Sequence, residues 1–293
     1  MVNNKRFSLR NISLFGIINT LILTCLAIIT VYPVVYITAV SLSATSEVVQ
    51  GNITLFPKGF NLDAYSQVLN DDRVPRAYLN TIFYTALGTA INLLLTAVAA
   101  YPLARKNFFG RKFFLLAIIM TMFLNPGIIP NYLIVSELGL LDSVWALVLP
   151  NAIWTFELLI LKSFYENMSE SLREAAVVDG ASEYRILFQI VLPLSKPALA
   201  SIGLFYFMGH WNSFFIPLIY LNDANMYPLQ VVLRDMLIFS ENGSNPSLVD
   251  ASALAPQAMK NATIVLSMIP VLLIYPFAQK YFAKGVMLGS EKG

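Results

Sequence analysis

The chain has 293 residues, of which 57% are hydrophobic and 12% are charged, and its net charge is +2. Soluble globular domains carry about 25% charged residues, so these charges are too few to cover the surface of a soluble protein of this size. The composition effectively excludes a water-soluble enzyme and a disordered chain, and it predicts one transmembrane domain over residues 1–293. The one cysteine, Cys25, excludes an intrachain disulfide.

Six apolar stretches are long enough, or nearly so, to cross a bilayer as a helix, which takes about 20 residues. The third is interrupted by Pro126 and Pro130, and the fourth carries Glu157, the one acidic residue within a stretch. The sequence thus predicts an all-α membrane protein with six transmembrane helices. In chain order the stretches cover residues 14–40, 81–103, 113–135, 143–161, 198–221 and 262–282.

The basic residues of the loops predict the orientation, because cytoplasmic loops are rich in Lys and Arg. Fourteen of the nineteen Lys and Arg lie on the side of the membrane that also holds both termini. Both termini are therefore expected in the cytoplasm, in agreement with an even number of spans. The five basic residues on the other side are Lys58, Arg73, Arg76, Arg234 and Lys260.

Two of the outer loops, residues 41–80 and 222–261, are long. Each contains an amphipathic stretch, at residues 61–69 in the first and 228–239 in the second.

The loop between the fourth and fifth stretches is predicted to form a helix, a turn and a second helix. Ser171 and Glu174 have the spacing of a capping box at the start of the first helix. Gly180 suits the left-handed position just after a helix end. Ser182 can cap the second helix, which Pro193 is expected to stop.

The loop covers residues 166–197. Its first helix has the composition of a docking element. Ala175 and Ala176 are small enough to let the backbone of another protein approach, and Glu174 and Asp179 can offer charge to it. On these grounds alone, a solvated hairpin between two spans accounts for the pattern equally well.

The same loop resembles the signature segment of the inner-membrane permease subunits of bacterial ABC importers. The matching residues are Glu174-Ala175-Ala176, then after two residues Asp179-Gly180-Ala181, and after eight more Ile190-x-Leu192-Pro193. The wider chain is similar to the maltose-type permeases of the carbohydrate uptake-1 group. The supporting stretches are residues 57–65, Ala100-Tyr-Pro-Leu-Ala-Arg105 and Trp211-Asn212, and the tail at 284–293 is similar to a subgroup that imports larger oligosaccharides.

This resemblance implies the type I ABC importer permease fold and a set of partners in the bacterial cytoplasmic membrane. A second homologous permease subunit would complete the path. Two copies of an ABC ATPase would dock on the cytoplasmic loops, and an extracellular or periplasmic binding protein would deliver the sugar. The coupling element would be Glu174, Ala175, Ala176, Asp179, Gly180 and Ala181, with Glu174 facing a basic residue of the ATPase.

The chain itself is expected to be non-catalytic and to hold no cofactor. It has no Gly-x-x-x-x-Gly-Lys-Ser/Thr loop for nucleotide phosphates, and no motif for catalysis or for a metal stands out. ATP and Mg are therefore expected on the partner ATPase, and no nucleic acid is expected as a partner.

Polar and aromatic residues within the stretches are candidates for the substrate path, because polar groups are costly in lipid. Trp154, His210, Trp211 and Asn212 suit a sugar, which stacks on aromatic rings and bonds to amides. Glu157, about four residues from the cytoplasmic end of its stretch, is expected to line the path or pair with the companion permease. The alternatives are helix packing for the first four residues and a local bond or snorkelling for Glu157.

Two other functions stay open at this point. An ABC permease for another solute, such as an amino acid or a phosphonate, would share the coupling loop but not the sugar-type flanking stretches. A secondary transporter would show inverted repeats and more acidic residues in the membrane, and neither is seen in this sequence.

Overall fold

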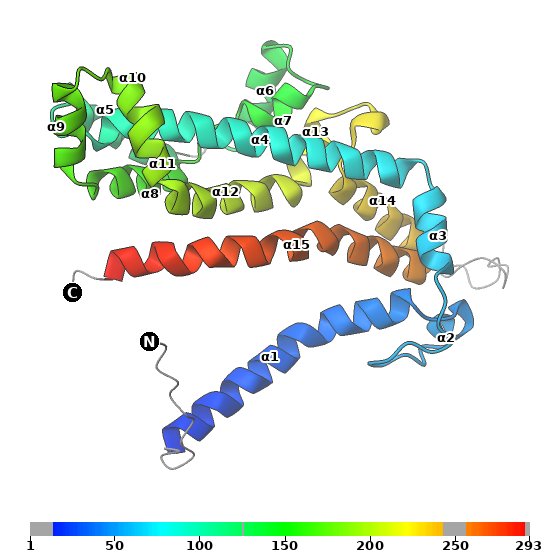
Figure 1. The fold of residues 1–293 in the computed structure, drawn as a ribbon. Coiled ribbons are helices and arrows are strands. Elements are labelled where there is room, and N and C mark those ends of the chain that lie inside the picture. Colours follow the sequence, from blue (N-terminus) through cyan, green and yellow to red (C-terminus); the bar gives the residue numbers. More distant parts are fainter. Residues whose placement is uncertain (1–13, 125, 243–255, 291–293) are drawn as a thin grey trace. The chain divides into compact units, whose positions relative to one another are not determined.

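The computed structural model in Figure 1 describes residues 14–124, 126–242 and 256–290. All of its regular secondary structure in these ranges is helical, which confirms the predicted all-α class. Internal contacts divide the chain into two units. The first is residues 1–70 with 236–266, and the second is residues 71–235 with 267–293.

The first unit begins with α1, Leu14–Ser41, an apolar helix of 28 residues. Its buried residues are confined to the last turn, at Ala39, Val40 and Ser41. Large apolar side chains along the rest of α1 are exposed. An apolar surface of this extent is stable in lipid rather than in water, so α1 has the properties of a membrane-spanning helix.

A folded loop follows α1 in the same unit and contains α2, Thr45–Val49, and α3, Asp63–Asn70. The hydroxyls of Ser41 and Tyr65 lie 2.8 Å apart and join the end of α1 to α3. The backbone N–H of Ala44 donates to the carbonyl of Lys58 at 2.9 Å. Helix α3 covers most of the amphipathic stretch at 61–69.

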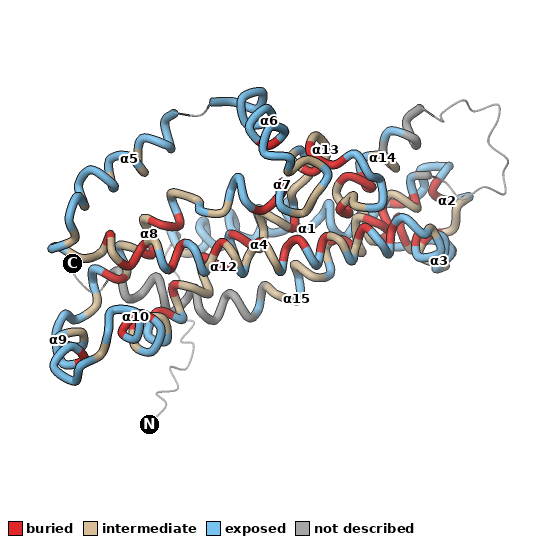
Figure 2. The backbone as a smooth tube through the Cα atoms, turned by 90° about the horizontal axis from the view of Figure 1, so that it is seen from above, coloured by how far each residue is buried: buried red, intermediate tan, exposed pale blue. Residues whose placement is uncertain are grey.

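The second unit is organised around α4, Arg73–Ala104. Helices α8, Thr155–Glu166, and α12, Lys196–Trp211, run alongside α4 (Figure 1). Figure 2 shows the buried residues concentrated along these three helices. The buried face of α4 is made largely of small or polar residues, as is usual where membrane helices approach closely. They include Ala77, Thr81, Thr85, Gly88, Asn92, Thr96 and Ala100.

The remaining helices of the second unit are shorter, except α15, and both α14 and α15 contribute residues to both units. Helix α14 covers most of the amphipathic stretch at 228–239. The bounds are α5 Arg111–Phe123, α6 Ile128–Glu137, α7 Val144–Val148, α9 Glu170–Val178, α10 Glu183–Ile186, η1 Leu187–Val191, α11 Leu192–Leu194, α13 Phe215–Tyr220, η2 Ala224–Met226, α14 Leu229–Asn242 and α15 Pro256–Ser290.

Three helices of the described ranges are long and apolar enough to cross a membrane: α1, α4 and the part of α15 at Gln257–Ile274. Two bent pairs also qualify when each is taken as one span. Helices α5 and α6 meet at 115°, and the segment Glu183–Leu194 meets α12 at 81°. Length and composition thus give three to five candidate spans in the part of the chain that the structure describes.

The stretch expected as the fourth span, residues 143–161, is not one helix. Helix α7 ends at Val148 and α8 begins at Thr155. Pro150 contributes to the break, because proline has no backbone N–H to continue the helical hydrogen bonds. The fifth stretch is also divided, since α12 ends at Trp211 and α13 begins at Phe215.

Candidate functional site: the helix–turn–helix loop

Helix α9 starts earlier than the sequence pattern indicated. Ser169 is its N-cap residue, with the extended backbone that this position requires, and Glu170 lies in the first turn, where a carboxylate favours the helix dipole. Ser171 is inside the helix, and its hydroxyl lies 2.7 Å from that of Ser169. The predicted capping box of Ser171 and Glu174 is therefore wrong.

The end of α9 matches the prediction. Gly180 has φ +76°, the left-handed conformation expected for it. Its N–H donates to the carbonyl of Val177 at 3.0 Å, and the N–H of Ala181 donates to that of Ala176 at 2.9 Å. These two bonds form a Schellman motif, which satisfies the last carbonyls of the helix and fixes the direction in which the chain leaves it.

Ser182 caps the second helix as predicted, since its hydroxyl accepts the N–H of Arg185 at 3.4 Å. The helical run then continues through a π-helical turn, η1, to Leu194. Pro193 lies in the last turn of this helical run and does not stop it. Because proline has no N–H, one carbonyl a turn earlier lacks its helical partner, and the π-helical turn lies there. The chain bends by 81° only after Leu194.

The exposed side of α9 has the chemistry of a docking surface. Figure 2 shows α9 as largely exposed. Glu174, Ala175, Asp179 and Gly180 are exposed, and the Val178 residue is 87% exposed. Glu174 has no ion pair within the described residues. This face therefore presents two acids, two small residues and one apolar residue to a partner.

Two of the alanines that the sequence grouped with this face point the other way. Ala176 is 7% exposed and belongs to an apolar cluster with Leu161, Tyr165 and Ile186, against which Ala181 also packs. Through this cluster the buried side of α9 packs against the rest of the second unit, while its other side stays exposed.

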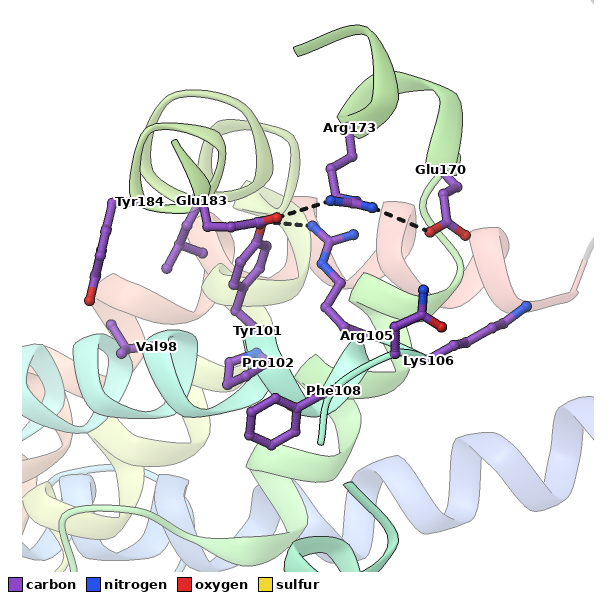
Figure 3. A pocket seen from close by; sticks show the side chains of 12 residues that line it. Val98, Tyr101, Pro102, Arg105, Lys106, Phe108, Glu170, Arg173, Glu183 and Tyr184 are labelled. Atoms are coloured by element: carbon purple, nitrogen blue, oxygen red, sulfur yellow. Dashed lines mark hydrogen bonds and ion pairs between the residues drawn. The ribbon is translucent and has the colours of Figure 1, made fainter. Parts of the chain in front are cut away.

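An ion pair that the sequence analysis missed supports α9. Arg173 Nη1 donates to Glu183 Oε1 at 2.9 Å, which joins α9 to α10. The two residues are ten apart and lie on different helices, so no helical spacing rule would have paired them. Both line a cavity of about 610 Å³ beside the end of α4 (Figure 3).

Among the candidates for the substrate path, Trp154 and His210 lie together. Their ring centres are 6.4 Å apart, and the Trp154 ring is 4.9 Å from that of Tyr206. His210 Nε2 lies 3.2 Å from Asn92 Oδ1, and the amide of Asn92 donates to the carbonyl of Asn151 at 3.0 Å. This polar cluster links α4, α12 and the turn before α8.

Trp211 and Asn212 are neighbours in sequence but differ in environment. Trp211 is 2% exposed, and its Nε1 donates to the carbonyl of Ser267 on α15 at 3.1 Å. Its ring stacks on that of Phe207. Asn212 follows the end of α12 with an exposed side chain, and its amide donates to the carbonyl of Met208 at 2.9 Å.

Glu157 lies in the first turn of α8, which begins at Thr155 and continues to Glu166. It is therefore farther from the end of its helix than the apolar stretch indicated. Its residue is 7% exposed, and it forms no ion pair with a described residue.

The described residues contain no group of three or more His, Cys, Asp and Glu that could hold a metal ion. An apolar all-α chain with such a structured loop belongs to the class of polytopic membrane transport subunits.

Comparison with known proteins identifies the family within this class. Residues 92–288 match the binding-protein-dependent transport system inner membrane components, and the chain belongs to this family. It is thus a non-catalytic permease subunit of an ABC transport system, whose ATPase is a separate chain, and the resemblance drawn from the coupling loop is confirmed.

Similar proteins include two from Bacillus subtilis. The polygalacturonan/rhamnogalacturonan transport system permease protein YtcP is 44% identical over 91% of this chain and 94% of its own. Protein LplC is 43% identical over 95% of each chain. A solved bacterial ABC transporter involved in the import of the acidic polysaccharide alginate has a similar structure. Its TM-score is 0.86 at 35% identity, with 94% of this chain and 99% of that chain covered.

Proposed function

We propose that this chain is the permease subunit of an ATP-driven importer of acidic oligosaccharides in the bacterial cytoplasmic membrane. It forms half of the translocation path and pairs with a second homologous permease. An extracellular or periplasmic binding protein delivers the sugar. Two copies of an ABC ATPase, which bind ATP and Mg, drive alternating access to the path.

The observation that supports the proposal most is the exposed face of α9, which is followed by the hydrogen-bonded turn at Gly180. Glu174, Ala175 and Val178 are open to a partner, while Ala176 and the Arg173–Glu183 ion pair attach the same helix to the rest of its unit. A rigid helix held in this way transmits a displacement from a bound ATPase to the permease. Glu174, without an ion pair of its own among the described residues, is available for a basic residue of the ATPase.

We propose six transmembrane segments with both termini in the cytoplasm. Helices α1, α4 and α15, the bent pair of α5 and α6, and α12 support five of them. The sixth combines α7 and α8 across the break at Pro150. This arrangement puts α9 on the cytoplasmic side, where fourteen of the nineteen basic residues fall, as ATPase docking requires.

The relatives support an acidic oligosaccharide as the substrate. One of them is named for polygalacturonan and rhamnogalacturonan transport, and the similar solved transporter is described as an importer of alginate. All three polymers contain uronic acids. A uronate oligomer is therefore the substrate class that we propose for this chain.

Of the five candidates for the path, Asn212 is the one whose side chain is exposed in this structure. We propose that its amide contacts the sugar. The ring and polar contacts of Trp154, His210 and Trp211 support a packing role for them. Glu157 is proposed as a residue of the path or of the contact with the companion permease.

The test is to produce the chain with an ABC ATPase, a second permease and a binding protein from the same bacterium. We expect the three membrane-associated chains to copurify. We also expect ATP hydrolysis to rise when the binding protein is loaded with a galacturonate oligomer, but not with a neutral glucose oligomer or an amino acid. Stimulation by an amino acid would assign another solute class, and failure to copurify with any ATPase would contradict the proposal.

A further inference from the structure

The end of α4 and the start of α10 meet at a single carboxylate (Figure 3). Tyr101 donates its hydroxyl hydrogen to Glu183 Oε2 at 2.5 Å, although the two residues are 82 positions apart. Arg105 Nη2 donates to the same tyrosine oxygen at 2.7 Å, and its guanidinium carbon lies 4.5 Å from the centre of the Tyr101 ring. Tyr101 and Arg105 are one helical turn apart, so they act on Glu183 as one unit.

The other oxygen of the same carboxylate belongs to the coupling helix. Glu183 Oε1 accepts the bond from Arg173 on α9, while Oε2 accepts the bond from Tyr101 on α4. Within the described residues, the ion pair with Glu183 is the one side-chain polar contact that α9 makes beyond its own helix and cap. The polar connection between α9 and α4 therefore runs through Glu183.

This connection differs in kind from the apolar support of α9. Contacts such as those of Ala176 have no preferred direction, whereas hydrogen bonds fix both distance and angle. Tyr101 is 8% exposed, and hydrogen bonds are stronger where water is largely excluded. These bonds therefore connect the position of α9 to the end of α4.

The surroundings of Glu183 leave room for these side chains to rearrange. The cavity of about 610 Å³ is lined by Tyr101, Arg105, Arg173 and Glu183 together with exposed Tyr184. The Nε atoms of Arg105 and Arg173 are buried and have no hydrogen-bond partner among the described residues. Both arginines thus keep a donor that the described contacts leave unused.

We propose, building on the function proposed above, that Tyr101 and Arg105 are positioning residues for coupling. Through Glu183 they convert the displacement of α9 by the ATPase into a movement of α4. This assigns a role to the stretch Ala100–Arg105, which the sequence marked only by family resemblance.

The experiment compares Tyr101→Phe with Tyr184→Phe in the complete complex, reconstituted in lipid vesicles. Both changes remove one hydroxyl beside the same cavity, but the hydroxyl of Tyr184 forms no hydrogen bond with a described residue. The measured quantity is the number of galacturonate oligomers taken up per ATP hydrolysed. We expect Tyr101→Phe to lower this ratio roughly tenfold, the loss expected for one hydrogen bond to a charged group. The KM for ATP and copurification should be unchanged, and Tyr184→Phe should behave as wild type.

A double-mutant cycle with Glu183→Gln separates coupling from packing. If Tyr101 acts through Glu183, the double variant is no worse than the poorer single variant, because residues in one network are not additive. Additive losses, a wild-type ratio in Tyr101→Phe, or a parallel loss of melting temperature and copurification would each overturn the proposal. A wild-type complex without ATP-driven uptake would instead contradict the proposed function itself.

Discussion

Gly180 is the residue on which the direction of the coupling loop depends. Its φ of +76° is unfavourable for β-branched side chains, at a strain of about 1–3 kcal/mol. An added Cβ would meet no atom within 4 Å, so the strain comes from the backbone and not from a clash. We expect Gly180→Val to redirect the chain after α9 and to lower binding-protein-stimulated ATP hydrolysis steeply, with membrane insertion and permease pairing retained.

The matched control for this change is Gly180→Asn. Asparagine tolerates the left-handed conformation better than other residues with a side chain, so stimulated hydrolysis should stay close to wild type. If valine and asparagine had the same effect, the backbone conformation at Gly180 would not be what the ATPase requires.

Asp142 joins two loops of the second unit on the side expected to be outside. The backbone N–H groups of Asp223 and Asn222 donate to its Oδ1 at 2.9 and 2.8 Å. These two bonds stabilise the charged form and lower the pKa of Asp142 below its ordinary value. The contribution of a carboxylate with a lowered pKa is complete above its ordinary pKa and is lost as the pH falls through the lowered value.

We therefore expect the amide hydrogens of Asn222 and Asp223 to be protected from exchange at neutral and mildly acidic pH. Protection should disappear only below the ordinary carboxyl pKa. Asp142→Ala should expose both amides to severalfold faster exchange at neutral pH. Asp142→Asn keeps an acceptor oxygen and tolerates the φ of +56° found here, so it should retain protection without the acid-induced loss. Equal exchange in the Ala and Asn variants would show that the side-chain oxygen is not the acceptor.

At the scale of elements, two glycines on α12 test the packing of this helix. A Cβ on Gly209 would overlap the ring of Trp154, whereas one on Gly203 would lie 3.2 Å from the flexible end of Leu93. We expect Gly209→Ala to destabilise the protein by about 1–3 kcal/mol, the usual cost of overpacking. Gly203→Ala should be near neutral, since alanine favours a helix by about 1 kcal/mol over glycine and this gain offsets the close contact with Leu93. The measurement is the melting temperature of the purified chain in detergent, and equal values for the two variants would contradict the described contact with Trp154.

The parts of the loop that the sequence predicted are those with local causes. Gly180 and Ser182 act on backbone groups one to four residues away, so their roles could be recognised from the sequence. The capping box failed because two serines, Ser169 and Ser171, offer the same chemistry two residues apart, and the sequence does not say which has the extended backbone. The Tyr101–Glu183 bond was beyond reach, because it depends on how α4 and α10 pack.

At the scale of the whole molecule, composition predicted the all-α class, and apolar length predicted the long helices. Apolar length did not predict the division of residues 143–161 between α7 and α8, because the turn at Pro150 is itself apolar and does not interrupt the hydropathy pattern. The path residues illustrate the same limit. Trp211 and Asn212 are adjacent in sequence, yet one is buried against α15 and the other is exposed.

The proposed topology can be tested in a Cys25-free background with one new cysteine at a time. Phe109→Cys lies in the loop between α4 and α5, and Gln50→Cys lies at the end of α2, and both native residues are exposed. An impermeant thiol reagent added to intact cells should label the cysteine at position 50 and not the one at position 109. Labelling at position 109 in intact cells would show the opposite orientation and would contradict a cytoplasmic position for α9.

The most direct test of the account is transport by the reconstituted complex of this chain, its companion permease, the ATPase and the binding protein. ATP is enclosed in the vesicles on the side that carries α9, and labelled galacturonate oligomer with its binding protein is added outside. We expect the sugar to accumulate above its outside concentration, and this accumulation should require both ATP and the binding protein. Accumulation driven by an ion gradient without ATP, or uptake that needs no binding protein, would contradict this expectation.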